Sequence, residues 1–199
     1  MSGESFRFIH ASDFHLENPL GDLDELPPPL RDALASAPFD AAAAVFEAAM
    51  SSNIDFVVLT GDLLHPQTAG PYGLHFLIAQ FEKLAALGKQ VYWAAGKVDD
   101  PSHWPDACVM PSNVTIFPRD SAVSIPIVRG GRTICRVVGR SSDGRSSVHI
   151  AGYEQDSAED FDIGVGYGEA SLDTLEEAKL EFWCLGGRHN RMEMESGDQ

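Results

Sequence analysis

Acidic and histidine side chains stand directly after three apolar stretches of this sequence. Asp13 and His15 follow the first stretch, Asp62 follows the second, and Asp99 comes shortly after the third. The Asp13-x-His15 spacing puts a carboxylate and an imidazole on the same side of an extended turn, and Gly61 lets the backbone bend so that Asp62 points back toward them. A lone Asp-x-His pair is more often a capped turn, but oxygen and nitrogen ligands in this combination suit manganese, iron or zinc. The pattern therefore predicts a metal site.

The apolar stretches are predicted strands, and helical segments separate them. Residues 55–62 form an apolar run too short for a helix, and residues 90–96 read as another strand. Residues 40–50 are alanine-rich with helical periodicity after Pro38, and residues 72–88 form a long amphipathic helix. This alternation favours a largely parallel, buried sheet, in which the loops after the carboxyl ends of the strands carry the site.

The second half of the chain consists mainly of short predicted strands. Clusters of Gly, Ser, Asp and Pro separate short β-type pieces, and these favour a second sheet that is mostly antiparallel or mixed. One more helix is predicted over 172–180, leading into a strand over 181–187. The polar residues 190–199 are expected to form a flexible tail, after one domain over 1–189. The β-type pieces read VTIF, AVSIPIV, TICRVVGR, SVHIAGY and FDIGVGYG.

Composition limits the classes of partner. The 199 residues include 14 Lys and Arg against 30 Asp and Glu, a formal net charge of −16, which repels a nucleic-acid backbone. The three cysteines are far apart in the sequence, which argues against a disulfide framework. The N-terminus lacks the pattern of a signal peptide. No stretch approaches the ~18 apolar residues of a membrane span. We therefore expect a cytoplasmic protein that does not enter a membrane.

The motifs resemble those of a known family. The segments FIHASDFHLENPL, DFVVLTGDLL, GKVDD, FDIGVGYGEA and FWCLGGRHN fall in the order found in the calcineurin-like metallophosphoesterases, and most closely resemble the DNA-repair exonuclease branch that includes the SbcD-type nuclease subunits. The resemblance implies an α/β fold, a four-layer sandwich of two central mixed β-sheets flanked by helices. It also implies metal-dependent hydrolysis of a phosphodiester substrate, which could be DNA.

The resemblance also implies which residues bind metal. The first metal would be held by Asp13, His15, bridging Asp62 and His189. One divalent ion is expected there, with Mn²⁺ first and iron or zinc as options. The family's ligands of a second metal correspond to Asp62, Lys97, Tyr167 and Gly187, of which only Asp62 is a metal ligand. The second site is therefore expected to be degenerate.

The GKVDD loop departs from the family's Gly-Asn-His-Asp. Val98 stands where the resemblance expects the histidine that protonates the leaving group, and valine has no proton to give. The Lys97 ammonium could take the place of the second metal and neutralise Asp62 and a bound phosphate. The expected catalytic residues are Asp62, Lys97 and Asp99, and the expected phosphate contacts are Lys97, Arg188 and Tyr167.

The sequence is compatible with alternative roles for two residues and with alternative functions for the chain. Arg188 could equally be a solvated arginine at a strand end, and Tyr167 could simply fill the space of an absent histidine. The chain could be a weak phosphoesterase, or an inactive pseudoenzyme that serves as a binding or regulatory module with at most one structural metal. A metal-free scaffold is a third reading. The oligomeric state does not follow from the sequence.

Overall fold

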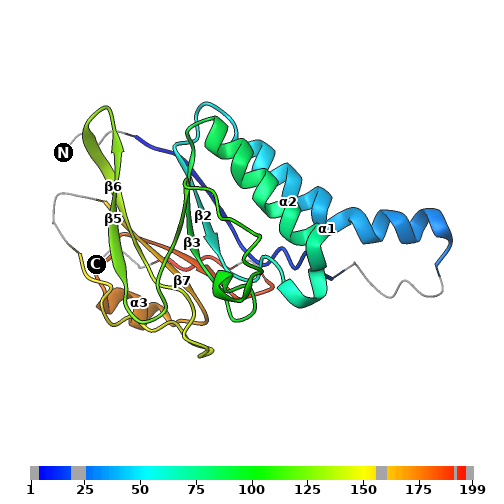
Figure 1. Cartoon of the computed structure of the whole chain (residues 1–199). Coiled ribbons are helices and arrows are strands. Elements are labelled where there is room, and N and C mark those ends of the chain that lie inside the picture. Colours follow the sequence, from blue (N-terminus) through cyan, green and yellow to red (C-terminus); the bar gives the residue numbers. More distant parts are fainter. Residues whose placement is uncertain (1–4, 19–25, 156–160, 191, 196–199) are drawn as a thin grey trace.

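Two four-stranded sheets face each other in the computed structural model, which describes residues 5–18, 26–155, 161–190 and 192–195. The strand orders are β1-β2-β3-β4 and β5-β6-β7-β8. Two long helices lie against the outer face of the first sheet, and a short helix lies on the side of the second (Figure 1). This arrangement confirms the α/β sandwich of two sheets and flanking helices.

The first sheet is parallel at each of its described pairings. It consists of β1 (Phe8–Ala11), β2 (Phe56–Thr60), β3 (Gln90–Ala94) and β4 (Val114–Ile116). The helices α1 (Pro28–Ala49) and α2 (Pro66–Ala86) connect β1 to β2 and β2 to β3. The alternation of strands and helices correctly predicted this sheet, and "mixed" describes only the second one.

Side chains of β2 alternate between the two layers of the core. Val57 and Leu59 pack with the helices, while Phe56 and Val58 pack against the second sheet. All four are at most 1% exposed. A strand covered on both faces explains why this stretch is continuously apolar.

The second sheet is mixed. β5 (Val123–Arg129) pairs antiparallel with β6 (Arg132–Gly139), while β7 (Asp162–Tyr167) and β8 (Phe182–Gly186) add in parallel. The helix α3 (Leu172–Glu177) connects β7 to β8, and a 3₁₀ turn, η1, spans Pro101–His103. The carboxyl ends of β7 and β8 therefore lie near those of β1 and β2, where the predicted ligands stand.

Two predicted elements differ from the structure. Residues 147–153 form no strand, because only Ser147 makes a bridge and a turn closes at Tyr153. The apolar residues there, Val148 and Tyr153, are buried by packing rather than by pairing in the sheet. The helix α1 begins at Pro28, well before the predicted residue 40, and its first part projects from the body (Figure 1).

The helix α2 contains a break at Gly70, whose φ of 63° and ψ of −167° are not helical. Its second segment begins next to the predicted start at residue 72. No helix in the described part of the chain is long and apolar enough to cross a membrane. The predicted tail over 190–199 lies partly outside the described residues.

Candidate metal centre

The loops that follow β1 and β2 are joined along their backbones. Asp13 N donates to Gly61 O over 3.0 Å, His15 N donates to Asp62 O over 3.0 Å, and Leu16 N donates to Leu63 O over 3.1 Å. These bonds extend the pairing of the two strands past their ends. The loops that carry Asp13, His15 and Asp62 therefore lie side by side.

The same three residues have left-handed backbone conformations. Their φ angles are 56° for Asp13, 45° for His15 and 51° for Asp62. Among the described non-glycine residues, only Lys179 also has a positive φ. Such conformations cost ~1–2 kcal/mol each in a residue with a Cβ, and they concentrate at functional sites. The backbone strain therefore coincides with the predicted ligands.

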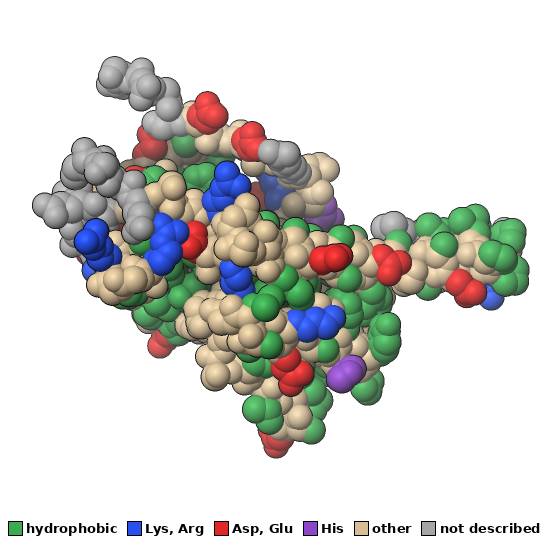
Figure 2. Space-filling model, turned by 90° about the horizontal axis from the view of Figure 1, so that it is seen from above, with side chains coloured by type: hydrophobic (Ala, Val, Ile, Leu, Met, Phe, Trp, Pro, Cys, Tyr) green, Lys and Arg blue, Asp and Glu red, His purple; other side chains and the backbone are tan. Residues whose placement is uncertain are grey.

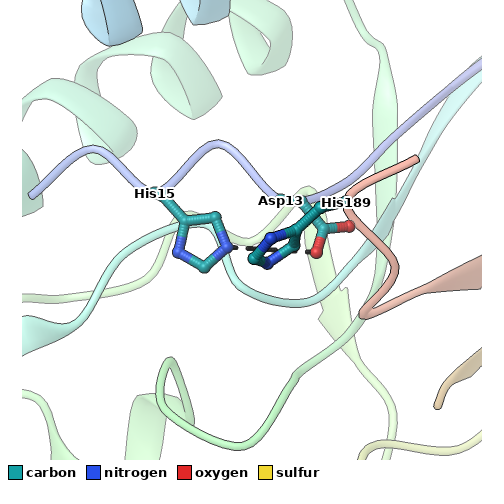
Figure 3. Close-up of side chains that lie close together, drawn as sticks. All are labelled: Asp13, His15 and His189. Atoms are coloured by element: carbon teal, nitrogen blue, oxygen red, sulfur yellow. Dashed lines mark ion pairs between the residues drawn. The ribbon is translucent and has the colours of Figure 1, made fainter. Parts of the chain in front are cut away.

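Asp13, His15 and His189 form a cluster that could hold a metal ion. One ligand atom from each lies within 4.8 Å of the others. His15 Nε2 is 4.0 Å from Asp13 Oδ1, and the rings of His15 and His189 are 5.2 Å apart between centroids. Figure 3 shows the three side chains turned toward one another, with His189 coming from the segment after β8. Gly187 N donates to Asp13 Oδ2 over 3.2 Å and ties that segment to the first loop.

Three buried atoms of the site have no hydrogen-bond partner among the described residues. They are Asp13 Oδ1, His15 Nε2 and Asp62 Oδ1. Buried polar atoms are nearly always satisfied, so a group of three in adjacent loops needs a partner. Asp13 Oδ1 and His15 Nε2 belong to the cluster with His189, and this donor set suits a divalent cation, whereas Asp62 lies outside the cluster of the described residues. The residues present therefore fit the metal that the sequence predicts.

Glu17 contacts the ring nitrogen of His15 that faces away from Asp13. The sequence did not predict this contact. Glu17 Oε1 lies 3.4 Å from His15 Nδ1, and Glu17 Oε2 accepts from His65 N over 2.9 Å. Histidines that bind metals usually donate their other ring nitrogen to such a carboxylate, which orients the ring and fixes its tautomer. The spacing of His15 and Glu17 in the sequence was the available clue.

Asp62 is bonded to Tyr167 rather than to Lys97. The Tyr167 hydroxyl donates to Asp62 Oδ2 over 2.5 Å. The ring fits into a slot made by Gly61, Gly96 and Gly187, because a Cβ on each would come within 2.9 Å of it. Tyr167 therefore occupies the space beside Asp62 Oδ2.

Asp99 is fully buried, and its carboxylate ties two loops together. Oδ1 accepts from Gly96 N over 2.6 Å and Oδ2 accepts from Leu63 N over 2.9 Å. Burial raises the pKa of Asp99 to about 7, and the charge of Asp62 adds to this shift against the two hydrogen bonds. Its contacts indicate that Asp99 positions the loop after β3.

Burial also raises the pKa of Asp13, with a contribution from the Asp62 charge, while hydrogen bonding from Gly187 opposes the shift. Two carboxylates close together in a partly buried site favour binding of a cation, which would relieve their repulsion.

The two expected cationic contacts lie at the surface. Lys97 is exposed and makes no hydrogen bond or ion pair with Asp62 or with any other described residue. Arg188 is also exposed, and its Nη1 contacts Met192 Sδ. Their action on a phosphate stays a prediction.

The comparisons with known proteins show the family to which the chain belongs. A sequence profile described as calcineurin-like phosphoesterase matches residues 6–180, and the chain belongs to that family. A curated relative is the "Uncharacterized metallophosphoesterase YhaO" of Bacillus subtilis (strain 168), 28% identical over 204 residues. The match covers 92% of this chain and 48% of the relative, so the chain spans about half of its length.

Proposed function

We propose that this chain is a metal-dependent phosphodiesterase that works with one divalent ion held by Asp13, His15, Asp62 and His189. The observation that carries the proposal is the set of unpartnered buried atoms on Asp13, His15 and Asp62, beside a histidine that reaches the same place. Mn²⁺ is the ion proposed first, with iron or zinc as alternatives.

A bound divalent ion would polarise the phosphoryl group and lower the pKa of a water molecule. The chain's own residues orient these partners. Glu17 fixes the ring of His15, Asp99 holds the loop after β3, and exposed His189 leaves one side of the site open to substrate. Lys97 and Arg188 stand at the surface as proposed electrostatic contacts for the phosphate.

The proposed activity is weak. Val98 supplies no proton to a leaving group, and general-acid help of ~10²–10⁴-fold is absent from that position. Tyr167 holds the second oxygen of Asp62, which supports the expectation of a degenerate second site. A cytoplasmic location belongs to the same proposal, and the charge of −16 favours a substrate smaller than the nucleic acid of a DNA-repair exonuclease.

A second candidate function is that of a pseudoenzyme that binds a metal without turnover and serves as a binding or regulatory module. The Tyr167–Asp62 hydrogen bond favours it, because it occupies a carboxylate oxygen that a two-metal enzyme would give to its second ion. A metal that binds only the native state must raise the melting temperature. A rise in the melting temperature on adding metal would therefore favour the pseudoenzyme over a metal-free scaffold.

The test is the initial rate of bis-(p-nitrophenyl) phosphate hydrolysis with added manganese. Wild type is compared with Asp62→Ala and with Asp106→Ala, a matched variant at an exposed acid outside the site. We expect a manganese-dependent rate in wild type and in Asp106→Ala that falls to background in Asp62→Ala. Equal background in all three proteins would overturn the phosphodiesterase, and a manganese-induced rise in melting temperature would then support the pseudoenzyme.

A further inference from the structure

A cavity of about 940 Å³ opens directly beside the candidate metal centre. Asp13, His15 and His189 line one end of it, and β8, α3 and residues 192–195 line the rest. Figure 2 shows a hollow on this face, with acidic side chains on the stretch of chain that arches over it. The cavity has the size of a small-molecule site, and a phosphate at the metal centre would extend its ester group into it.

The wall of the cavity beyond the metal centre is partly apolar. Trp183 and Phe182 provide aromatic surface, and Leu180 and Met192 provide aliphatic surface. Phe182 is 47% exposed and Met192 is 52% exposed, so both offer apolar surface at the cavity. An organic group with carbon surface would bury these side chains.

The charge of the wall is negative. Five glutamates line the cavity, and Arg188, at the metal end, is the cation among the lining residues that the structure describes. The side chains of Glu169 and Glu176 are exposed and make no hydrogen bond or ion pair with the described residues. Both are therefore available to a bound cation.

We propose that the cavity binds the alcohol part of a small phosphoester, and that this part carries an ammonium group of the amino-alcohol or choline type. This inference rests on the proposed function, because it takes the metal centre to hold the phosphate. The glutamates attract the cation, and the apolar wall of the cavity covers the carbon atoms around it. A nucleic acid would instead bring its next phosphate against the glutamates and be repelled.

The experiment compares two chromogenic phosphodiesters in manganese, p-nitrophenyl phosphorylcholine and bis-(p-nitrophenyl) phosphate. We expect wild type to favour the choline ester in kcat/KM. The double variant Glu169→Gln, Glu176→Gln should lose at least ~10-fold for the choline ester, through KM, and little for the other substrate. Glu47→Gln, at an exposed glutamate on α1, is the matched control and should change neither rate.

The outcomes separate the inference from the proposed function. Manganese-dependent hydrolysis of bis-(p-nitrophenyl) phosphate, with no preference for the choline ester and no effect of the double variant, would overturn the inference alone. A preference for single-stranded oligonucleotide ends would do the same. If neither ester is hydrolysed, binding of phosphocholine to the manganese-loaded chain is measured by calorimetry. Binding that the double variant loses would uphold the inference without the activity, and no binding would overturn it.

Discussion

Tyr167 and Asp62 are 105 positions apart in the chain, and their side chains meet through a hydrogen bond of 2.5 Å. The bond links the end of β7 to the loop after β2. Because the acceptor is a carboxylate in a partly buried site, the bond belongs to the stronger, charge-assisted class. Tyr167 therefore contributes to the stability of the metal-free chain.

Replacing Tyr167 with Phe should lower the free energy of unfolding of the metal-free protein by ~1.5–3 kcal/mol, because the ring keeps its glycine slot while Asp62 loses its donor. The measurement is urea denaturation in EDTA. The matched control is Tyr153→Phe, which removes a hydroxyl bonded over 2.8 Å to the Val165 carbonyl, with an expected cost of ~0.5–1.5 kcal/mol.

Manganese affinity provides the second measurement on these variants. Tyr167→Phe frees Asp62 Oδ2 and should tighten manganese binding, while Tyr153→Phe should leave it unchanged. If the two variants behaved alike in both measurements, the hydroxyl of Tyr167 would have no particular part in the site.

At the level of single residues, the proximity of three predicted ligands could be anticipated from the sequence, but the contacts that support them could not. Asp13, His15 and His189 do come together, because residue type, spacing and a preceding strand all restrict their positions. Glu17 and the hydrogen bond of Tyr167 were not predicted, because a supporting contact depends on how the loops turn. Lys97 was expected near Asp62, but the glycine slot admits the tyrosine ring and leaves the lysine exposed.

The two sheets come close together where β8 passes β2. A Cβ added to Gly186 would lie 1.5 Å from the carbonyl oxygen of Thr60. Thr60 is two residues before Asp62, and Gly186 is three residues before His189. The distance between the two sheets at this point therefore determines how the two sides of the metal centre meet.

Gly186→Ala should destabilise the protein by at least ~3 kcal/mol and reduce manganese affinity, because β8 must move away from β2. Urea denaturation and manganese titration measure the two effects. Gly88→Ala is the control: its φ is +69° with open space around it, so only a backbone cost of ~1–2 kcal/mol is expected. Comparable losses in both variants would show that β2 and β8 can separate without harm.

Local periodicity predicted which segments are helices and which are strands. It did not predict where each helix or strand begins and ends. The parallel sheet was predictable because its strands are continuously apolar and alternate with helices. Residues 147–153 carry the same apolar alternation but pack Val148 and Tyr153 into the core from a turn. The sequence also places Pro38 inside α1, where local rules end a helix.

The molecule as a whole carries a formal charge of −16, and its site buries carboxylates that resist ionisation. The pKa of Asp99 is about 7 in the folded state, against an ordinary value of 3.8. Between these two pH values the folded chain binds a proton that the unfolded chain has released. The contribution of Asp99 to the stability of the metal-free protein therefore falls as the pH rises from about 4 to about 7.

Asp99 should lower the free energy of unfolding in EDTA by a few kcal/mol between pH 5 and pH 7.5. Buried His10, whose pKa is lowered to about 4 from an ordinary 6.5, acts in the opposite direction below about pH 6.5 and offsets part of this fall. Urea denaturation should therefore show that the stability of Asp99→Asn rises relative to wild type as the pH rises through this range, because its side chain has no proton to lose. Asp106→Asn, at an exposed acid, should follow wild type, and the same pH dependence in all three proteins would contradict the role of Asp99.

The left-handed conformations of Asp13, His15 and Asp62 have a consequence for anyone who engineers this chain. Glycine adopts a positive φ without the strain that these three residues bear. A screen for heat resistance alone would therefore favour their replacement by glycine. The variants that such a screen enriched would have lost carboxylates and an imidazole from the proposed metal site. Selection for heat resistance and selection for the proposed metal binding therefore favour different residues at these three positions.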